Sequence, residues 1–120
     1  MNVLFLAPLR LEKLLGDQWQ VLERFDAMID GKVHSVPAGY VTDLASVPRM
    51  PLAYLLAGGR APKSAVLHDH LYETRAGRDF ADHVFLAAMK AEGVPSWIAK
   101  AMDWGVRVGG EERYGVHATG

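Results

Sequence analysis

Alternation of apolar and polar residues predicts β-strands in the first third of the chain. Trp19, Val21, Glu23 and Phe25 alternate with residues of the opposite face, so one face of this segment is mostly apolar. A period of two is typical of a strand that buries one face. A further strand is expected around Leu9 to Leu15.

The dipeptide Asp30-Gly31 separates two short runs, residues 27–29 and 32–36, that also read as strands. Asp-Gly is typical of a two-residue hairpin turn, because both turn positions need positive φ. The sequence therefore predicts an antiparallel hairpin here, and we expect the strand around residues 9–15 to join it.

Proline and glycine end the strand pattern after Val36. The segment Pro37–Pro48 contains both residue types, and Thr42 or Asp43 can cap a short turn within it. The run from Met50 to Gly59 is apolar and ends in two glycines, which predicts a short helix or a covered loop.

Helical spacing begins after this run. Pro62 suits the first position of a helix that runs to about Glu73. Asp79 can cap a second helix, which Gly93 ends, and Asp82 follows Asp79 at capping-box spacing.

A third helix is expected from Pro95 to about Val108, followed by a loose tail over residues 109–120. Asp103 and Arg107 lie at pairing distance on its solvated face, beside Lys100. The expected core positions of the second and third helices are Ala81, Val84, Phe85, Ala88, Met89, Ile98, Ala101, Met102 and Gly105.

Together these elements predict an α+β fold, with an N-terminal antiparallel sheet of about three strands packed on three or four C-terminal helices. A chain of 120 residues is long enough for one core, so a single domain over 1–120 is expected. The chain has no cysteine, which excludes disulfides and thiolate metal sites. A net charge of −1 without any basic run disfavours nucleic acid as a partner.

No apolar stretch approaches the roughly twenty residues that a membrane-crossing helix needs. The N-terminal run Asn2–Ala7 is short and has no basic region before it, so it is a poor signal peptide. We expect a soluble protein that is made in the cytoplasm of its host.

The greatest chemical interest lies in His68, Tyr72 and Asp82. On a helix, His68 and Tyr72 are four residues apart and share a face, and Asp82 from the second helix could converge with them. A buried histidine held by a carboxylate can activate water at neutral pH, and the acid fixes its tautomer. The same bond could instead be structural and fix how the two helices pack.

Asp69 points about a quarter-turn away from His68 and can serve a different partner. Asp43 and Asp69, with carbonyls from a glycine-containing turn, would form an oxygen-rich set suited to calcium. Capping of the turn is the simpler role for Asp43.

A zinc site built from His68, His70 and His83 is conceivable, but His68 and His70 are two residues apart on a helix and face different directions. That site is therefore disfavoured. His34 and His117 are expected at the surface.

Several motifs, in order, resemble the DUF1353 family of phage- and prophage-associated proteins. They are PAGYVTDLASVPR at residues 37–49, AVLHDHLY at 65–72, ADHVFLAAM at 81–89 and WGVR at 104–107. The resemblance extends from about Leu9 to Gly110. It implies a small protein encoded by tailed bacteriophages or prophages, in a family whose activity is not assigned.

The segments HDHLY and ADHVF are also similar, more locally, to the catalytic helices of phospholipase A2, notably the cysteine-free domain of parvovirus capsids. This similarity implies that His68 activates water, that Asp69 binds calcium and that Asp82 orients the histidine, with Tyr72 bonded in the same network. The glycine-rich calcium loop of that family has no clear match shortly before His68.

Two functions stay open at this point. The first is a non-enzymatic phage protein, either a virion or tail-associated component that binds phage structural proteins or a host-interaction factor. The second is a phospholipase-type hydrolase that acts on an ester, with a component of the host envelope as its target.

Overall fold

The computed structural model describes residues 1–44 and 63–119, and the side chains among them up to residue 108. The expected short helix or loop at Met50–Gly59 lies outside the described residues. Within those ranges, six strands precede three helices, which confirms the α+β fold. The strands are β1 (Val3–Phe5), β2 (Leu11–Lys13), β3 (Trp19–Val21), β4 (Phe25–Ile29), β5 (Lys32–Val36) and β6 (Val41–Thr42). The helices are α2 (Lys63–Glu73), α3 (Arg78–Glu92) and α4 (Ser96–Thr119).

The predicted hairpin is confirmed as the antiparallel pair β4–β5. Ile29 lies opposite Lys32, and the two turn residues Asp30 and Gly31 have φ of 48° and 82°. β1 pairs with the other edge of β4, so this sheet has the strand order β1-β4-β5. The N-terminal run is thus a strand, which the sequence did not indicate.

The expectation that a strand around Leu9 to Leu15 joins the hairpin is wrong. That segment forms β2, which pairs with β3 in a second sheet of order β2-β3-β6. The alternating segment from Trp19 to Phe25 is likewise divided between the two sheets. Val21 and Phe25 are nevertheless both completely buried in one core cluster, so the alternation predicted the buried face and not the partner strand.

The first two helices begin and end close to their predicted residues. α3 does not use Asp79 as its cap, because its N-cap is Gly77 and no side chain caps it. Gly93 ends α3 in the left-handed conformation, with φ of 79°, as predicted.

α4 continues past Val108 to Thr119, so its expected end was wrong. Glycines at 109 and 110 lower helix propensity by about 1 kcal/mol each relative to alanine, but they do not remove a backbone donor as proline would. The Asp103–Arg107 pair on this helix is confirmed, with 3.0 Å between Oδ1 and Nε.

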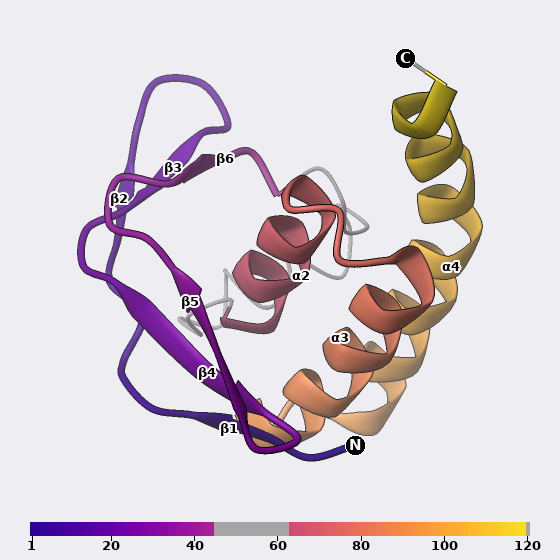
Figure 1. Ribbon diagram of the computed structural model, residues 1–120, viewed down its shortest axis with the longest axis horizontal. Coiled ribbons are helices and arrows are strands. Elements are labelled where there is room, and N and C mark those ends of the chain that lie inside the picture. The colour runs from indigo at the N-terminus through magenta and orange to yellow at the C-terminus, as the bar shows by residue number, and fades with distance from the viewer. Residues whose placement is uncertain (45–62, 120) are drawn as a thin grey trace.

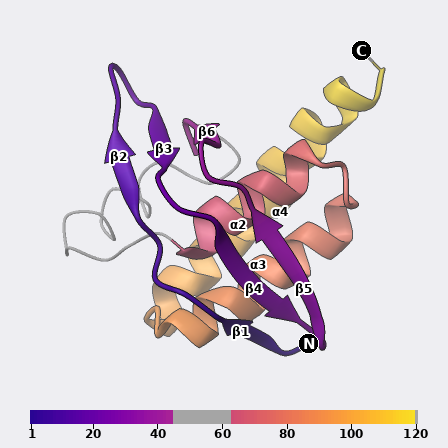
Figure 2. The ribbon, with the colours of Figure 1, turned by 60° about the vertical axis from the view of Figure 1, so that its left-hand side comes forward.

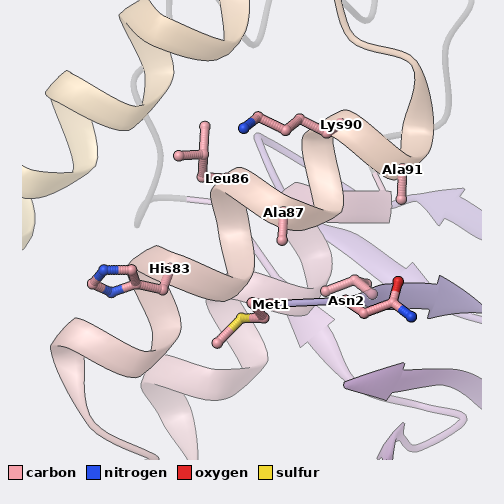
Figure 3. Close-up of a pocket in the computed structure, with 8 residues that line it drawn as sticks. Met1, Asn2, His83, Leu86, Ala87, Lys90 and Ala91 are labelled. Atoms are coloured by element: carbon pink, nitrogen blue, oxygen red, sulfur yellow. The ribbon is translucent and has the colours of Figure 1, made fainter. Parts of the chain in front are cut away.

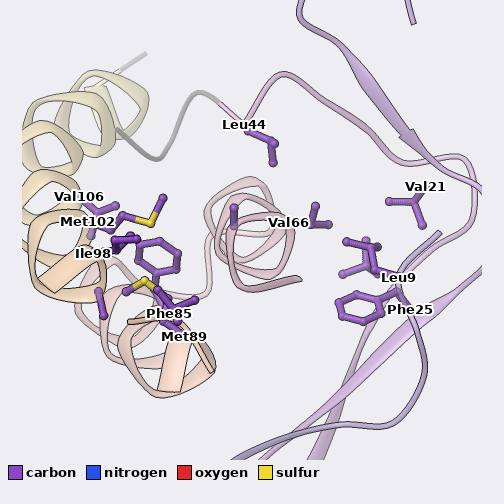
Figure 4. Close-up of a cluster of buried hydrophobic side chains, with 14 residues drawn as sticks. Leu9, Val21, Phe25, Leu44, Val66, Phe85, Met89, Ile98, Met102 and Val106 are labelled. Carbon is purple, nitrogen blue, oxygen red and sulfur yellow. The ribbon is translucent and has the colours of Figure 1, made fainter. Parts of the chain in front are cut away.

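α2 lies at the centre of the molecule, between the strands on one side and α3 and α4 on the other (Figures 1 and 2). Figure 4 shows the same arrangement in the core, where Val66 of α2 lies between Phe25 and the side chains of α3 and α4. Every residue of α2 from Ser64 to Tyr72 is buried. A helix covered on all sides is normally apolar all round, so the polar residues of α2 require explanation.

The predicted core positions of α3 are all buried. In α4, Ile98 and Met102 are buried as predicted, whereas Ala101 is exposed and Gly105 is only half-buried. The buried face of α4 instead includes Ala99 and Val106, so it is rotated about the helix axis from the predicted face.

Candidate functional site

Polar side chains of α2 form hydrogen bonds with neighbours on different sides of the helix. At its start, Ser64 Oγ donates to Glu92 Oε1 over 2.8 Å, and the main-chain N–H groups of Lys63 and Ser64 donate to the same carboxylate. Glu92, at the end of α3, therefore caps the start of α2, although the two lie far apart in the sequence. Because burial of an unpaired polar group is costly, these bonds are a condition for placing α2 at the centre.

His68, Tyr72 and Asp82 converge between α2 and α3, as their spacing predicts. His68 Nε2 lies 2.8 Å from Asp82 Oδ1, and the two side chains are 0% and 1% exposed. The Tyr72 hydroxyl donates to the same carboxylate oxygen over 3.3 Å. The imidazole also packs on the rings of Tyr72 and Phe85, at centroid distances of 4.5 and 4.8 Å.

The capping-box role predicted for Asp82 is wrong, because its carboxylate faces α2. Its second oxygen, Oδ2, lies 3.9 Å from Arg78 Nε. Arg78 Nη2 in turn donates to the main-chain carbonyl of Arg107 over 2.7 Å. Arg78 was not predicted as part of this group, although its i,i+4 spacing from Asp82 was a usable signal.

The contact with Asp82 indicates which tautomer His68 adopts. An ionised carboxylate only accepts hydrogen bonds, so Nε2 carries the hydrogen that Asp82 accepts. In that tautomer Nδ1 is the acceptor nitrogen of the ring. The dyad thus has the geometry of a general base and its orienting acid.

Asp69, the next residue along α2, faces the second sheet. Its Oδ2 accepts hydrogen bonds from Tyr40, over 2.9 Å, and from Thr42. Thr42 Oγ1 also accepts the N–H of Leu44 over 2.9 Å, which confirms the capping role predicted for Thr42. Burial, followed by the nearby charge of Asp69, raises the pKa of Tyr40.

His70 faces the first sheet, and its Nδ1 lies 2.8 Å from His34 Nε2. His34 is half-buried, so its expected surface position was wrong. His34 shares a strand face with the buried Val36, and this period-two relation was the signal that could have placed it inward. Burial lowers the pKa of His34. Burial, and then the neighbouring His34, lower the pKa of His70 against an opposing effect of Asp69.

In the part of the chain that the structure describes, no three His, Cys, Asp or Glu side chains are placed to bind a metal ion. His83 is exposed on α3, where its Nδ1 donates to the carbonyl of Asp79 over 2.6 Å. Asp69 Oδ2 already accepts bonds from two hydroxyl groups. The assignment of Asp69 and Asp43 to calcium therefore stays a prediction that these contacts do not favour.

Two cavities lie away from the dyad. The larger, of about 520 Å³, is between the N-terminus and the outer face of α3, where His83 and Lys90 contribute to its lining (Figure 3). The other, of about 380 Å³, lies beside the β4–β5 turn and includes His34 and Phe80. None of His68, Tyr72 or Asp82 lines either cavity.

Over the described ranges, no helix has both the length and the apolar character that crossing a membrane requires. Positions 109–119 of α4, whose side chains are not described, include charged residues in the sequence.

Comparison with known proteins assigns most of the chain to one family. The chain is 37% identical over 81 residues to "Uncharacterized protein y4jT" of Sinorhizobium fredii (strain NBRC 101917 / NGR234), a match that covers 64% of this chain and 24% of that protein. The chain thus spans about a quarter of the length of this relative. No solved structure matches this chain. The model of a family described as proteins of unknown function matches residues 19–106, which include both networks, and the chain therefore belongs to the DUF1353 family.

Proposed function

We propose that this chain is a phospholipase-type ester hydrolase, encoded by a phage or prophage, in which His68 and Asp82 activate water. The observation that carries the proposal is the 2.8 Å contact between His68 Nε2 and Asp82 Oδ1, with Tyr72 bonded to the same oxygen. These contacts join the residues that the similarity to the phospholipase A2 helices implies. With Nε2 donating to Asp82, the proposal assigns the role of the base to Nδ1.

In the proposed reaction, Nδ1 of His68 takes a proton from a water molecule while the water oxygen attacks the carbonyl carbon of an ester. The tetrahedral intermediate collapses, the bond to the leaving alcohol breaks, and the proton passes from Nδ1 to the alcohol oxygen. The products are an alcohol and a carboxylic acid, and the acid releases its proton to solvent to become a carboxylate. Asp82 keeps the imidazole oriented and stabilises its charged form throughout.

Asp69 has a positioning role in this proposal. By accepting bonds from Tyr40 and Thr42, it fixes β6 and the residue before it against α2, next to His68. No step is assigned to a metal ion, because the contacts of Asp69 do not match those of a calcium ligand set.

One observation favours a second candidate, a non-enzymatic virion or tail-associated protein. His68 is 0% exposed and lies on a helix that is covered on all sides. In that role the His68–Asp82 bond locks α2 against α3, and the partners are phage structural proteins.

A matched pair of variants separates the two candidates. Hydrolysis of mixed phospholipid vesicles is measured with and without calcium for the wild type, His68→Gln and His83→Gln. The amide that His68→Gln introduces can still donate to Asp82, but it cannot take a proton at neutral pH. A hydrolase loses about 10²-fold or more of its turnover in His68→Gln, keeps it in the exposed His83→Gln, and keeps its melting temperature in both.

Turnover by His68→Gln at the wild-type rate would contradict the proposed base. The absence of turnover by the wild type under both calcium conditions, with a lower melting temperature for His68→Ala than for His68→Gln, would favour the structural role.

A further inference from the structure

The outer side of α4 carries a stripe of exposed apolar side chains. Trp97, Trp104 and Val108 are 63%, 70% and 56% exposed, and Ala101 lies between the two tryptophans. Their spacing of four, three and four residues places them on one face of the helix. We call these four residues the α4 stripe. It is separate from the buried face of Ile98, Met102 and Val106, which belongs to the core.

The size of the α4 stripe argues against a stable dimer built on it alone. The stripe is about 16 Å long at 1.5 Å per residue. Its two tryptophans and valine expose on the order of 400 Å², whereas a standard protein interface buries about 800 Å² on each partner. A patch of this size on a monomer is nevertheless large enough to be a functional surface.

Charges beside the α4 stripe favour an anionic partner. Lys100 is exposed and lies one turn before Trp104. The carboxylate of Asp103 is paired with Arg107 at 3.0 Å, so the described flank of the stripe carries a net positive charge. Tryptophan, with an apolar ring and an N–H donor, is favoured where a membrane meets water, and basic residues are attracted to anionic lipid headgroups.

The α4 stripe is connected to the candidate dyad. Arg78 contacts Asp82 at 3.9 Å and donates to the carbonyl of Arg107 over 2.7 Å. Arg107 is adjacent in sequence to Val108 and one turn from Trp104. A surface bound to the stripe would therefore lie near the middle of α4, where the carbonyl of Arg107 accepts a bond from the Arg78 that faces Asp82.

We propose that the α4 stripe docks in the plane of an anionic phospholipid surface, with Trp97 and Trp104 inserted at the headgroup level and Lys100 facing the headgroups. The docking deepens the proposed function by naming how the substrate is presented. It rests on that function for the identity of the substrate, whereas the docking itself rests on the stripe.

Vesicle sedimentation tests the docking directly, with phosphatidylcholine vesicles that contain phosphatidylglycerol or lack it. We expect the wild type to bind the anionic vesicles, and Trp97→Ser/Trp104→Ser to bind at least about tenfold more weakly. Leu15→Ser is the matched control, because Leu15 is an exposed apolar residue, 94% accessible, outside the stripe. It should bind as the wild type does, and melting temperatures verify that all variants are folded.

Two further variants sharpen the test. In a Trp19→Phe background, tryptophan emission comes from the α4 stripe alone and should shift to shorter wavelength on anionic vesicles. Lys100→Glu should weaken binding to anionic vesicles and leave any binding to neutral ones unchanged.

Wild-type protein that fails to bind vesicles, or a double tryptophan variant that binds as well as the wild type, overturns the docking. Self-association that the double variant abolishes, without vesicle binding, assigns the stripe to a second copy of the chain and also overturns it. Vesicle binding without hydrolysis refutes the proposed function and leaves the docking intact. Hydrolysis without stripe-dependent binding refutes the docking and leaves the proposed function intact.

Discussion

The two polar networks around α2 use similar residues in different ways. Toward α3, His68 is bonded to a carboxylate and is completely buried among aromatic rings. Toward the sheets, His70 is bonded to another histidine, and Asp69 accepts bonds from hydroxyl groups. Residues 68, 69 and 70 reach different neighbours because successive helical residues are rotated by about 100°.

This difference shows why only one histidine of the pair is a candidate base. His68 contacts a carboxylate, Asp82, whereas burial and a second imidazole favour the neutral form of His70. The proposed hydrolysis uses the first network to move a proton, whereas the second network fastens the sheets to α2.

Removal of Asp82 should have the largest effect. Asp82→Ala leaves His68 and Tyr72 buried without their shared acceptor, and we expect the free energy of unfolding to fall by about 3–5 kcal/mol. Urea unfolding measures this loss. Asp79→Ala is the control on the same helix, because Asp79 is exposed, and its effect should be much smaller. Equal losses for the two variants would show that the dyad is not a principal bond between α2 and α3.

Thr42 offers the corresponding test of the network toward the sheets. Thr42→Val removes the donor to Asp69 and the acceptor for the Leu44 N–H, so we expect a loss of about 1–3 kcal/mol in urea unfolding. Thr42→Ser keeps the hydroxyl and should retain most of the stability. If the serine variant is as unstable as the valine variant, packing of the methyl group matters more than these bonds.

Acid should weaken the network toward the sheets through His34 and His70. Both pKa values are lowered in the folded protein, so the unfolded chain takes up protons first, near the ordinary value of about 6.5. The free energy of unfolding should therefore be unaffected by these groups above that pH. It should fall as the pH drops below it, with a slope of less than about 1.4 kcal/mol per pH unit for each histidine, because His34 is partly solvated.

Urea unfolding measured at several pH values between 8 and 5, for the wild type, His70→Gln and His83→Gln, would isolate this contribution. His70→Gln should flatten the slope, whereas the exposed His83→Gln should leave it unchanged. An unchanged slope in His70→Gln would mean that other groups cause the acid sensitivity.

The smallest effect is expected for Tyr72→Phe. This change removes the 3.3 Å bond to Asp82 and leaves the His68 contact in place, so it should cost about 0.5–1.5 kcal/mol by urea unfolding. If the proposed hydrolysis occurs, its rate should change far less than in His68→Gln. A loss as large as that of Asp82→Ala would place Tyr72 at the centre of the network.

Local patterns in the sequence predicted much of the fold. The Asp30-Gly31 turn, the end of α2, the buried face of α3 and the glycine that ends α3 all depend on neighbouring residues, and all are confirmed. Strand pairing beyond the β4–β5 hairpin was not predicted, because alternation shows which face is buried and not which strand lies alongside. For this reason the partner of β2 was wrong and β1 was missed.

The same limit applies to the candidate site. Helical spacing was sufficient to predict that His68, Tyr72 and Asp82 could converge. The contacts of Asp69 and His70 could not be predicted in the same way, because Tyr40 and His34 come from strands whose positions depend on long-range pairing. The catalytic and metal-binding roles of these residues stay predictions.

The central position of α2 has a consequence for how the protein opens. An amide hydrogen in a helix covered from both sides can exchange with solvent only after the surrounding layers separate. Backbone amides of α2 from Leu67 to Tyr72 should therefore be among the slowest to exchange deuterium, at rates set by complete unfolding, whereas those of the outlying β2–β3 hairpin should exchange through local opening.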